Sequence, residues 1–221
     1  MEIEDKNDIV NLNDSSLELR FIKKDIIKWD ENNEEQNYIL VFDLGGGTYD
    51  LSLIEIMLTS LETITTAGNQ KLGGGDFDNK LMEYCLENFS KNANIDKEII
   101  MKNFKAMQNL KIVCEQSKKN LSFREEDIIF IEDFYNEESL SVSIDSKKFE
   151  DLCKEFFDKL IEPINKVIKD AKKKEINKID EIILVGGSSK ITKIKEILSE
   201  KFKDVSINDL INHIFYLYYL F

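Results

Sequence analysis

Three consecutive glycines, Gly45, Gly46 and Gly47, separate two apolar segments of the sequence and restrict its fold more than any other feature. The segment before them, residues 38–42, is a continuous apolar run typical of strands that are buried on both faces. The segment after them, residues 51–56, carries leucines and isoleucines that predict a second strand. The sequence therefore predicts a hairpin whose tip is bare backbone.

The chemistry of this tip suits an anion. Successive glycines let several backbone N–H groups approach a phosphate without obstruction by Cβ atoms, and Thr48 adds a hydroxyl donor. Asp43 ends the first strand beside the tip, where its carboxylate can hold a hydrated magnesium ion or orient a water molecule. An ordinary tight hairpin with an acid that caps the turn is the alternative interpretation of these residues.

The composition excludes several classes of protein. Among 221 residues, 42% are hydrophobic and 33% are charged, as in a globular chain rather than a disordered or fibrous one. The net charge of −13 removes the counterion release that drives binding to nucleic acids and anionic membranes, so we expect neither as a partner. The apolar residues 214–221 are too few to span a bilayer, which takes roughly 20, and no secretory signal is visible, so we expect a cytoplasmic protein. One histidine and three widely spaced cysteines argue against a zinc site.

The remaining pattern mixes strands and helices, which indicates an α/β or α+β architecture. Further strands are predicted at residues 61–66, 127–132, 139–144 and 182–185. Helices are predicted from Asp76, as an N-cap, to about residue 90, at 96–121, from about 146 with a break or restart at Pro163, and after residue 189. Residues 1–37 are expected to be a poorly ordered leader with one weak apolar cluster at 21–29.

A second glycine pair is also a candidate for phosphate binding. Gly186 and Gly187 follow a predicted buried strand and precede a helix, where backbone donors and the helix dipole attract anions. A helix capped by Ser188 or Ser189 is the alternative interpretation. None of the glycine-rich segments contains a Walker-type loop or a complete dinucleotide fingerprint, so P-loop and Rossmann folds are excluded.

One face of the predicted helix at 96–121 carries an acid, two amines and a hydroxyl at spacings of three, four and seven. These residues are Glu115, Lys118, Lys119 and Ser122. Together they can hold a ribose and the face of a base, but a solvated helix face explains the same pattern.

Several motifs, taken in order, resemble those of one family. They are residues 41–50 (VFDLGGGTYD), 66–69, 72–74, 76–79, 114–115, 118–122, 149–152 and 184–188. From residue 38 to residue 205 the chain resembles the second lobe of the ATPase domain of the 70-kilodalton heat-shock chaperones, within the actin-like ATPase superfamily.

The resemblance implies an architecture. It implies an α/β fold with a ribonuclease-H-like core at residues 38–70 and 144–205 and an inserted α+β subdomain at 71–143. Residues 206–221 are then expected to be an aromatic tail outside that lobe.

The resemblance also implies roles for particular residues in binding ATP or ADP with Mg²⁺. Asp43 would face the magnesium through water, and with Thr48 it would be catalytic, while Gly45, Gly46, Gly47 and Thr48 would wrap the phosphates. The ribose and adenine would be held by Glu115, Lys118 and Ser122, with Gly186, Gly187 and Ser188 on the phosphate and adenosine side. Lys119 and Lys190 stand where the family has two arginines that sandwich the adenine, so the flat stacking surface is lost. Asp43 and Ser122 are therefore expected to open onto one shared hollow.

Residues 1–37 do not resemble the family's first lobe, and we expect neither that lobe before residue 38 nor a peptide-binding domain after the aromatic tail. We therefore expect an ATP-binding fragment of a chaperone with weak or absent hydrolysis when alone, and with co-chaperones or an exchange factor as possible partners. The alternative is a non-catalytic interaction module that docks an exchange factor or a first lobe supplied in trans. A truncated gene product is a third interpretation.

Overall fold

A five-stranded mixed sheet forms one end of the molecule in the computed structural model, which describes residues 37–57 and 60–209. The strand order is β3-β2-β1-β6-β7, with β1, β2 and β3 antiparallel and β1, β6 and β7 parallel. The strands are β1 (Asn37–Leu44), β2 (Tyr49–Ile56), β3 (Leu61–Asn69), β6 (Glu181–Val185) and β7 (Ser206–Asn208). This mixed sheet, with helices packed against it, confirms the predicted α/β class.

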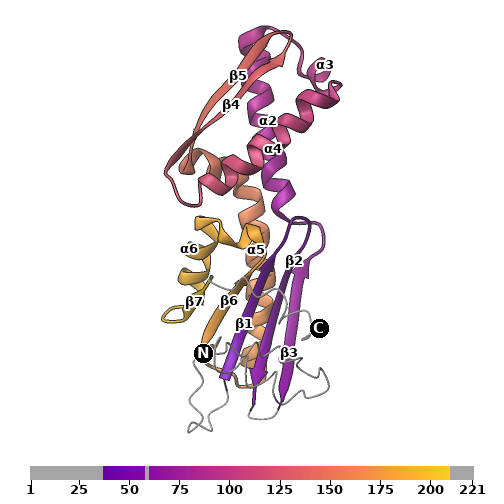
Figure 1. Ribbon diagram of the computed structural model, residues 1–221. Helices are drawn as coiled ribbons and strands as arrows, with labels where there is room; N and C mark the ends of the chain where they lie inside the picture. Colours follow the sequence, from indigo (N-terminus) through magenta and orange to yellow (C-terminus); the bar gives the residue numbers. More distant parts are fainter. Residues whose placement is uncertain (1–36, 58–59, 210–221) are drawn as a thin grey trace, which may run out of the picture.

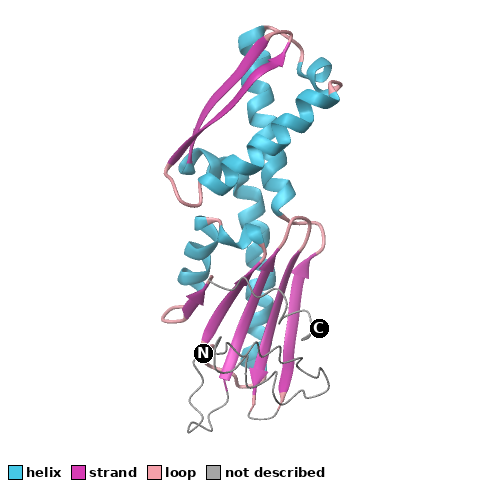
Figure 2. Cartoon of the chain, in the orientation of Figure 1, coloured by secondary structure: helices cyan, strands magenta, loops and turns pink. Residues whose placement is uncertain are grey.

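A second group of elements lies beyond one end of this sheet (Figure 1). It holds the two-stranded sheet of β4 (Glu126–Tyr135) and β5 (Glu138–Asp145) and three helices, α2 (Gly74–Ala93), α3 (Lys97–Met101) and α4 (Phe104–Asn120). The long helix α5 (Ser146–Lys173) runs from this group down along the large sheet (Figure 2). After β6 come the 3₁₀ turn η2 (Gly187–Lys190) and helix α6 (Thr192–Lys201).

The central strand β1 is buried on both faces, as its continuous apolar run predicts. Leu40, Phe42 and Leu44 belong to the main core, which includes apolar residues of α5 and α6. Ile39 and Val41 point to the opposite face, where they are also buried. Because β1 pairs with β2 on one side and with β6 on the other, its backbone groups are satisfied within the sheet.

Aromatic rings join helix α2 of the second group to α5. The ring of Phe77 lies 5.4 Å from that of Phe156, 5.3 Å from that of Phe157 and 6.2 Å from that of Phe149, between centroids. Rings at these tilted separations attract one another beyond the gain from their buried area. This cluster therefore fixes the start of α2 against α5.

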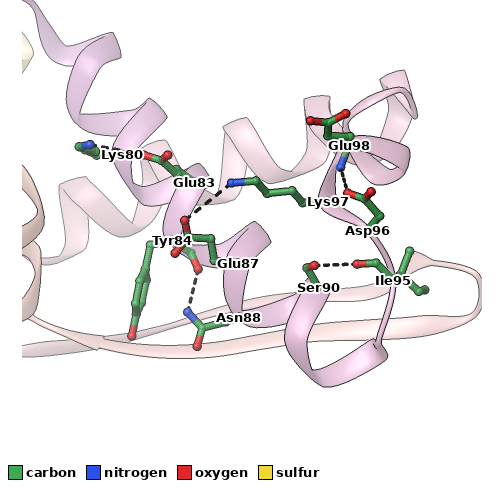
Figure 3. A network of polar contacts seen from close by, with 10 residues as sticks. All are labelled: Lys80, Glu83, Tyr84, Glu87, Asn88, Ser90, Ile95, Asp96, Lys97 and Glu98. Carbon is green, nitrogen blue, oxygen red and sulfur yellow. Dashed lines mark hydrogen bonds and ion pairs between the residues drawn. The ribbon is translucent and has the colours of Figure 1, made fainter.

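The predicted single helix at 96–121 is wrong, because two helices with separate caps occupy this stretch. The Asp96 side chain accepts from Glu98 N at the start of α3, and the Asn103 side chain accepts from Ala106 N at the start of α4. Figure 3 shows the polar contacts that surround the turn from α2 into α3, including the hydrogen bond from the Ser90 hydroxyl to Ile95 O. Phe104, the first residue of α4, is exposed although it is apolar.

Two other helix predictions also differ from the structure. Helix α5 continues through Pro163 without a break, because its apolar stripe is buried in the core on both sides of the proline and offsets the lost hydrogen bond. Asp76 is not the N-cap of α2: the cap is Gly73, and the Asp76 carboxylate accepts from Gly73 N at 2.8 Å as the third helical residue.

The large sheet extends past the predicted boundary at residue 205. Residues 206–208 form β7, which pairs in parallel with β6, so they belong to the sheet rather than to an aromatic tail. The predicted leader up to residue 36 and the apolar stretch 214–221 lie outside the described residues. Within the described part of the chain, no helix combines the length and apolar character needed to cross a bilayer.

Phe77→Ala is expected to lower the free energy of unfolding by about 3–5 kcal/mol, because it empties the centre of the aromatic cluster. Phe104→Ala is the matched control, since Phe104 is 77% exposed and its loss should cost no more than about 0.5 kcal/mol. Urea unfolding of both variants measures the difference. Equal losses would show that the cluster contributes nothing specific.

Candidate functional site

The glycine turn between β1 and β2 is open backbone. Leu44 pairs with Tyr49 at the end of the hairpin, and Gly45 N donates to Thr48 O at 3.1 Å to close the turn. Gly46, Gly47 and Thr48 are exposed, and a Cβ atom added to Gly46 or Gly47 would meet no atom within 4 Å. An anion can therefore approach this backbone closely, as the sequence predicts for the tip.

A second glycine cluster, residues 73–75, packs directly against this turn. Gly74 N donates to Gly45 O and Gly75 N donates to Gly46 O, both at 2.8 Å. A Cβ on Gly73 would lie 2.5 Å from Gly47 Cα, which is closer than side chains allow. Our sequence reasoning did not place these glycines in the site. Three glycines at the start of a helix are unfavourable unless close packing requires them, so their position in the sequence could have indicated this contact.

Asp43 and Gly186 lie together at the end of the sheet. Gly186 has φ +82°, and a Cβ there would come within 2.3 Å of Leu44 O and 2.9 Å of Asp43 Oδ1, so both conformation and space require glycine. Asp43 is paired across the hairpin with Asp50. Burial raises the pKa of the half-buried Asp43 carboxyl, and the charge of Asp50 raises it further. A cation near these two acids would stabilise their ionised forms and so oppose the rise in the pKa of Asp43. This donor set therefore fits a hydrated Mg²⁺.

Lys118 reaches the glycine clusters from α4. Its Nζ lies 2.8 Å from Asp78 Oδ1 and donates to Gly74 O at 3.1 Å. Ser188 approaches Gly74 from the other side, because a Cβ on Gly74 would lie 2.1 Å from the Ser188 hydroxyl oxygen. Burial raises the pKa of Asp78, and the Lys118 ammonium opposes that rise. Four segments that are far apart in the sequence therefore meet at the start of α2.

The predicted polar face of α4 does not exist as one surface. Lys118 is buried against α2, whereas Lys119 is exposed and Glu115 is partly exposed, and these two pair with each other at 2.7 Å. This pairing lowers the pKa of Glu115. The helix ends at Asn120, so Ser122 lies in the following turn, where its hydroxyl donates to Lys118 O at 3.4 Å. Glu115 and Lys119 thus have the geometry of the solvated face that was the alternative interpretation.

Ser122 borders a hollow of about 430 Å³ between the end of α4 and the starts of α5 and α6. Its polar lining includes Lys118, Arg124, Ser146 and Thr192. Asp43 and the glycine turn are not among the residues that line it. Lys118 belongs to both regions, since it lines the hollow and contacts Gly74. Instead of the expected single hollow, the structure has two adjacent regions, the glycine turn with Asp43 and the hollow beside Ser122, which are joined at Lys118.

The glycine pair at 186–187 does not sit at the N-terminus of a long helix. The short turn η2 intervenes before α6, and Ser189 donates its hydroxyl to Gly186 O at 2.7 Å. Neither Ser188 nor Ser189 makes a side-chain cap of the kind the alternative interpretation required. Gly187 is open, with no atom within 4 Å of an added Cβ, and Lys190 is exposed at the end of η2.

Comparison with known proteins assigns this arrangement to a family. The family model described as Hsp70 protein matches residues 26–213. "Heat shock cognate 70 kDa protein 3" of Dictyostelium discoideum is 39% identical over 174 residues, which are 79% of this chain and 27% of that protein. A "Ribosome-associated molecular chaperone" of Zygosaccharomyces rouxii is 37% identical over 180 residues, which are 81% of this chain and 29% of that protein. The chain thus spans little more than a quarter of the length of these relatives.

Gly73→Ala is expected to destabilise the fold by about 1–3 kcal/mol, because the added methyl group collides with the backbone of Gly47. Gly46→Ala is the control, since its methyl group enters open space. Thermal or urea unfolding compares the two. Similar stabilities would show that the glycine clusters are not in close contact.

Asp43→Asn is expected to stabilise the fold near neutral pH and to lose this effect as the pH is lowered. The raised pKa means that the folded chain binds a proton at Asp43 more tightly than the unfolded chain does. The ionised carboxylate therefore lowers the stability of the fold at pH values above the pKa of the folded state. This cost disappears at pH values below the pKa of the unfolded state, where Asp43 is protonated in both states. Urea unfolding at a series of pH values from about 8 to about 4 follows the change. A variant less stable than the natural chain at neutral pH would contradict the burial of this charge.

Proposed function

Because the chain belongs to the Hsp70 protein family, we propose that its described part binds an adenine nucleotide together with Mg²⁺, as one lobe of a chaperone ATPase. The observation that carries the proposal is the open glycine turn at residues 45–47, held in place by a second glycine cluster and flanked by Asp43. Bare backbone beside a carboxylate is suited to phosphate and to the cation that accompanies it.

We assign the phosphate end of the nucleotide to the turn. The exposed backbone of Gly46 and Gly47 lets phosphate oxygens reach main-chain N–H groups, and the exposed Thr48 offers a hydroxyl. Asp43 would hold waters of the Mg²⁺ shell and orient a water toward the terminal phosphate. When bound, Mg²⁺ supplies the positive charge that offsets the developing charge on the phosphates.

We assign the nucleoside to the region joined at Lys118. Ser122 and the hollow beside it would take part of the base or ribose, and Ser188 lies at the border with the phosphate end. The exposed Glu115, Lys119 and Lys190 would contribute only if they leave their present surroundings, since Glu115 and Lys119 are paired with each other. Lysine also lacks the planar group that stacks on a base, so we propose modest affinity.

We propose that hydrolysis by this chain alone is slow. Electrostatic stabilisation of a transferring phosphoryl group needs donors around it in a cleft that excludes water, and removing one such donor costs about 10²-fold or more in rate. The glycine turn offers donors from one side and is open on the other. Co-chaperones or an exchange factor are proposed as partners on the strength of the family alone.

Gly46→Val is expected to abolish binding of Mg-ADP while the chain stays folded. Its side chain would stand in open space where a phosphate must approach, so it blocks the ligand without a clash in the protein. Isothermal titration calorimetry of the purified chain, with the melting temperature recorded in parallel, measures both effects.

Ser141→Val is the matched control, because it places the same side chain on the exposed face of β5, far from the turn in the sequence. This control should bind Mg-ADP as the natural chain does. Chelation of the metal should weaken ADP binding to the natural chain. Unchanged affinity of Gly46→Val, or no binding by the natural chain at high ligand excess, would refute the proposed function.

A further inference from the structure

The ion pair of Asp78 and Lys118 is buried at the junction of α2 and α4. The two side chains are each 8% exposed, and their charged atoms are 2.8 Å apart. A buried pair of this kind loses in desolvation about what it gains in attraction, so fold stability alone does not explain it. Its contacts point instead to a role in shaping the site.

The contact that matters is made by the peptide unit between Gly74 and Gly75. Its oxygen accepts from Lys118 Nζ at 3.1 Å, and its N–H donates to Gly46 O at 2.8 Å. Because a peptide unit is planar, fixing the direction of the oxygen also fixes the direction of the N–H group. Lys118 is thus connected to the glycine turn through one rigid group.

Asp78 completes this connection. It lies one helical turn after Gly74 on α2 and holds the Lys118 ammonium close to Gly74 O. Two contacts of the ammonium, which has three donors, are thereby made inside the protein. This geometry differs from the ribose contact that the family resemblance implies for Lys118.

We propose that Asp78 and Lys118 are positioning residues, which hold the second glycine cluster against the turn and thereby set the affinity for the phosphate end of the nucleotide. The effect on nucleotide affinity rests on the proposed function, whereas the support of the glycine turn by these two residues does not. Without the ammonium, the peptide unit at Gly74 loses the hydrogen bond that Lys118 donates to its oxygen. The turn at residues 45–47 then loses the support that keeps it in shape.

The test uses the double variant Asp78→Leu, Lys118→Met, because replacing both charges by apolar side chains avoids leaving one charge buried without a partner. Lys80→Met, Glu83→Leu is the matched control, since it removes a more exposed acid and base from the same helix, where Lys80 pairs with Glu83 and with Glu155 of α5. Amide hydrogen exchange of the nucleotide-free chains is measured by NMR. We expect Gly75 to exchange about tenfold faster or more in the Asp78/Lys118 variant and at the natural rate in the control.

Calorimetry with Mg-ADP and with adenosine then separates the two possible roles of Lys118. A positioning role predicts that affinity for Mg-ADP falls about tenfold while affinity for adenosine, which has no phosphate, changes less than about twofold. Equal losses for both ligands would assign a ribose contact and overturn the proposal, as would unchanged exchange of Gly75. If the natural chain binds neither ligand, the proposed function fails and the exchange rates alone decide the positioning role.

Discussion

Two stretches of main chain, residues 45–47 and 73–75, are in contact, with no room for a side chain on Gly73, and the rest of the site depends on this contact. Two hydrogen bonds of 2.8 Å join them, and a single added Cβ at Gly73 would meet Gly47 at 2.5 Å. The contact ties the hairpin of the large sheet to the first turn of α2. Since α2 carries Phe77 and Asp78, it also sets where the aromatic cluster and the buried ion pair lie.

The sheet places a second close approach of main chain beside the first. The parallel pairing of β1 with β6 aligns Asp43 with Val185, so the chain leaves β6 at Gly186 directly over Leu44 O and the Asp43 carboxylate. Parallel strands end at the same edge, and loops that follow them there can share a ligand. The left-handed conformation of Gly186 turns the chain into η2, which presents Ser188 to Gly74. Burial of β1 on both faces fixes the position of this edge in the core.

The sequence predicted the parts of the fold that depend on local pattern. The apolar runs of β1 and β6 and the alternation in β4 and β5 need no knowledge of the partner strands. The sequence does not identify Asn103 as a cap, because the residue after it, Phe104, is apolar and only the structure shows that its ring is exposed. Pro163 predicts a break or a restart of the helix because its cost is local, whereas the burial that offsets this cost depends on tertiary packing. Helical spacing predicts that Lys118 lies on a polar face, because spacing alone does not reveal that its partner, Asp78, comes from another helix.

Charge limits what this site can accept. The chain carries a net charge of −13, and Asp43 and Asp50 face one another across the hairpin beside the glycine turn. A nucleotide adds further negative charge at the same place, where partial burial already disfavours an ionised Asp43. The one buried cation nearby, among the described residues, is Lys118, and its charge is shared with Asp78. The protein therefore offers open backbone to a phosphate but little positive charge. A divalent cation bound between the phosphate and the two acids would replace their repulsion by attraction.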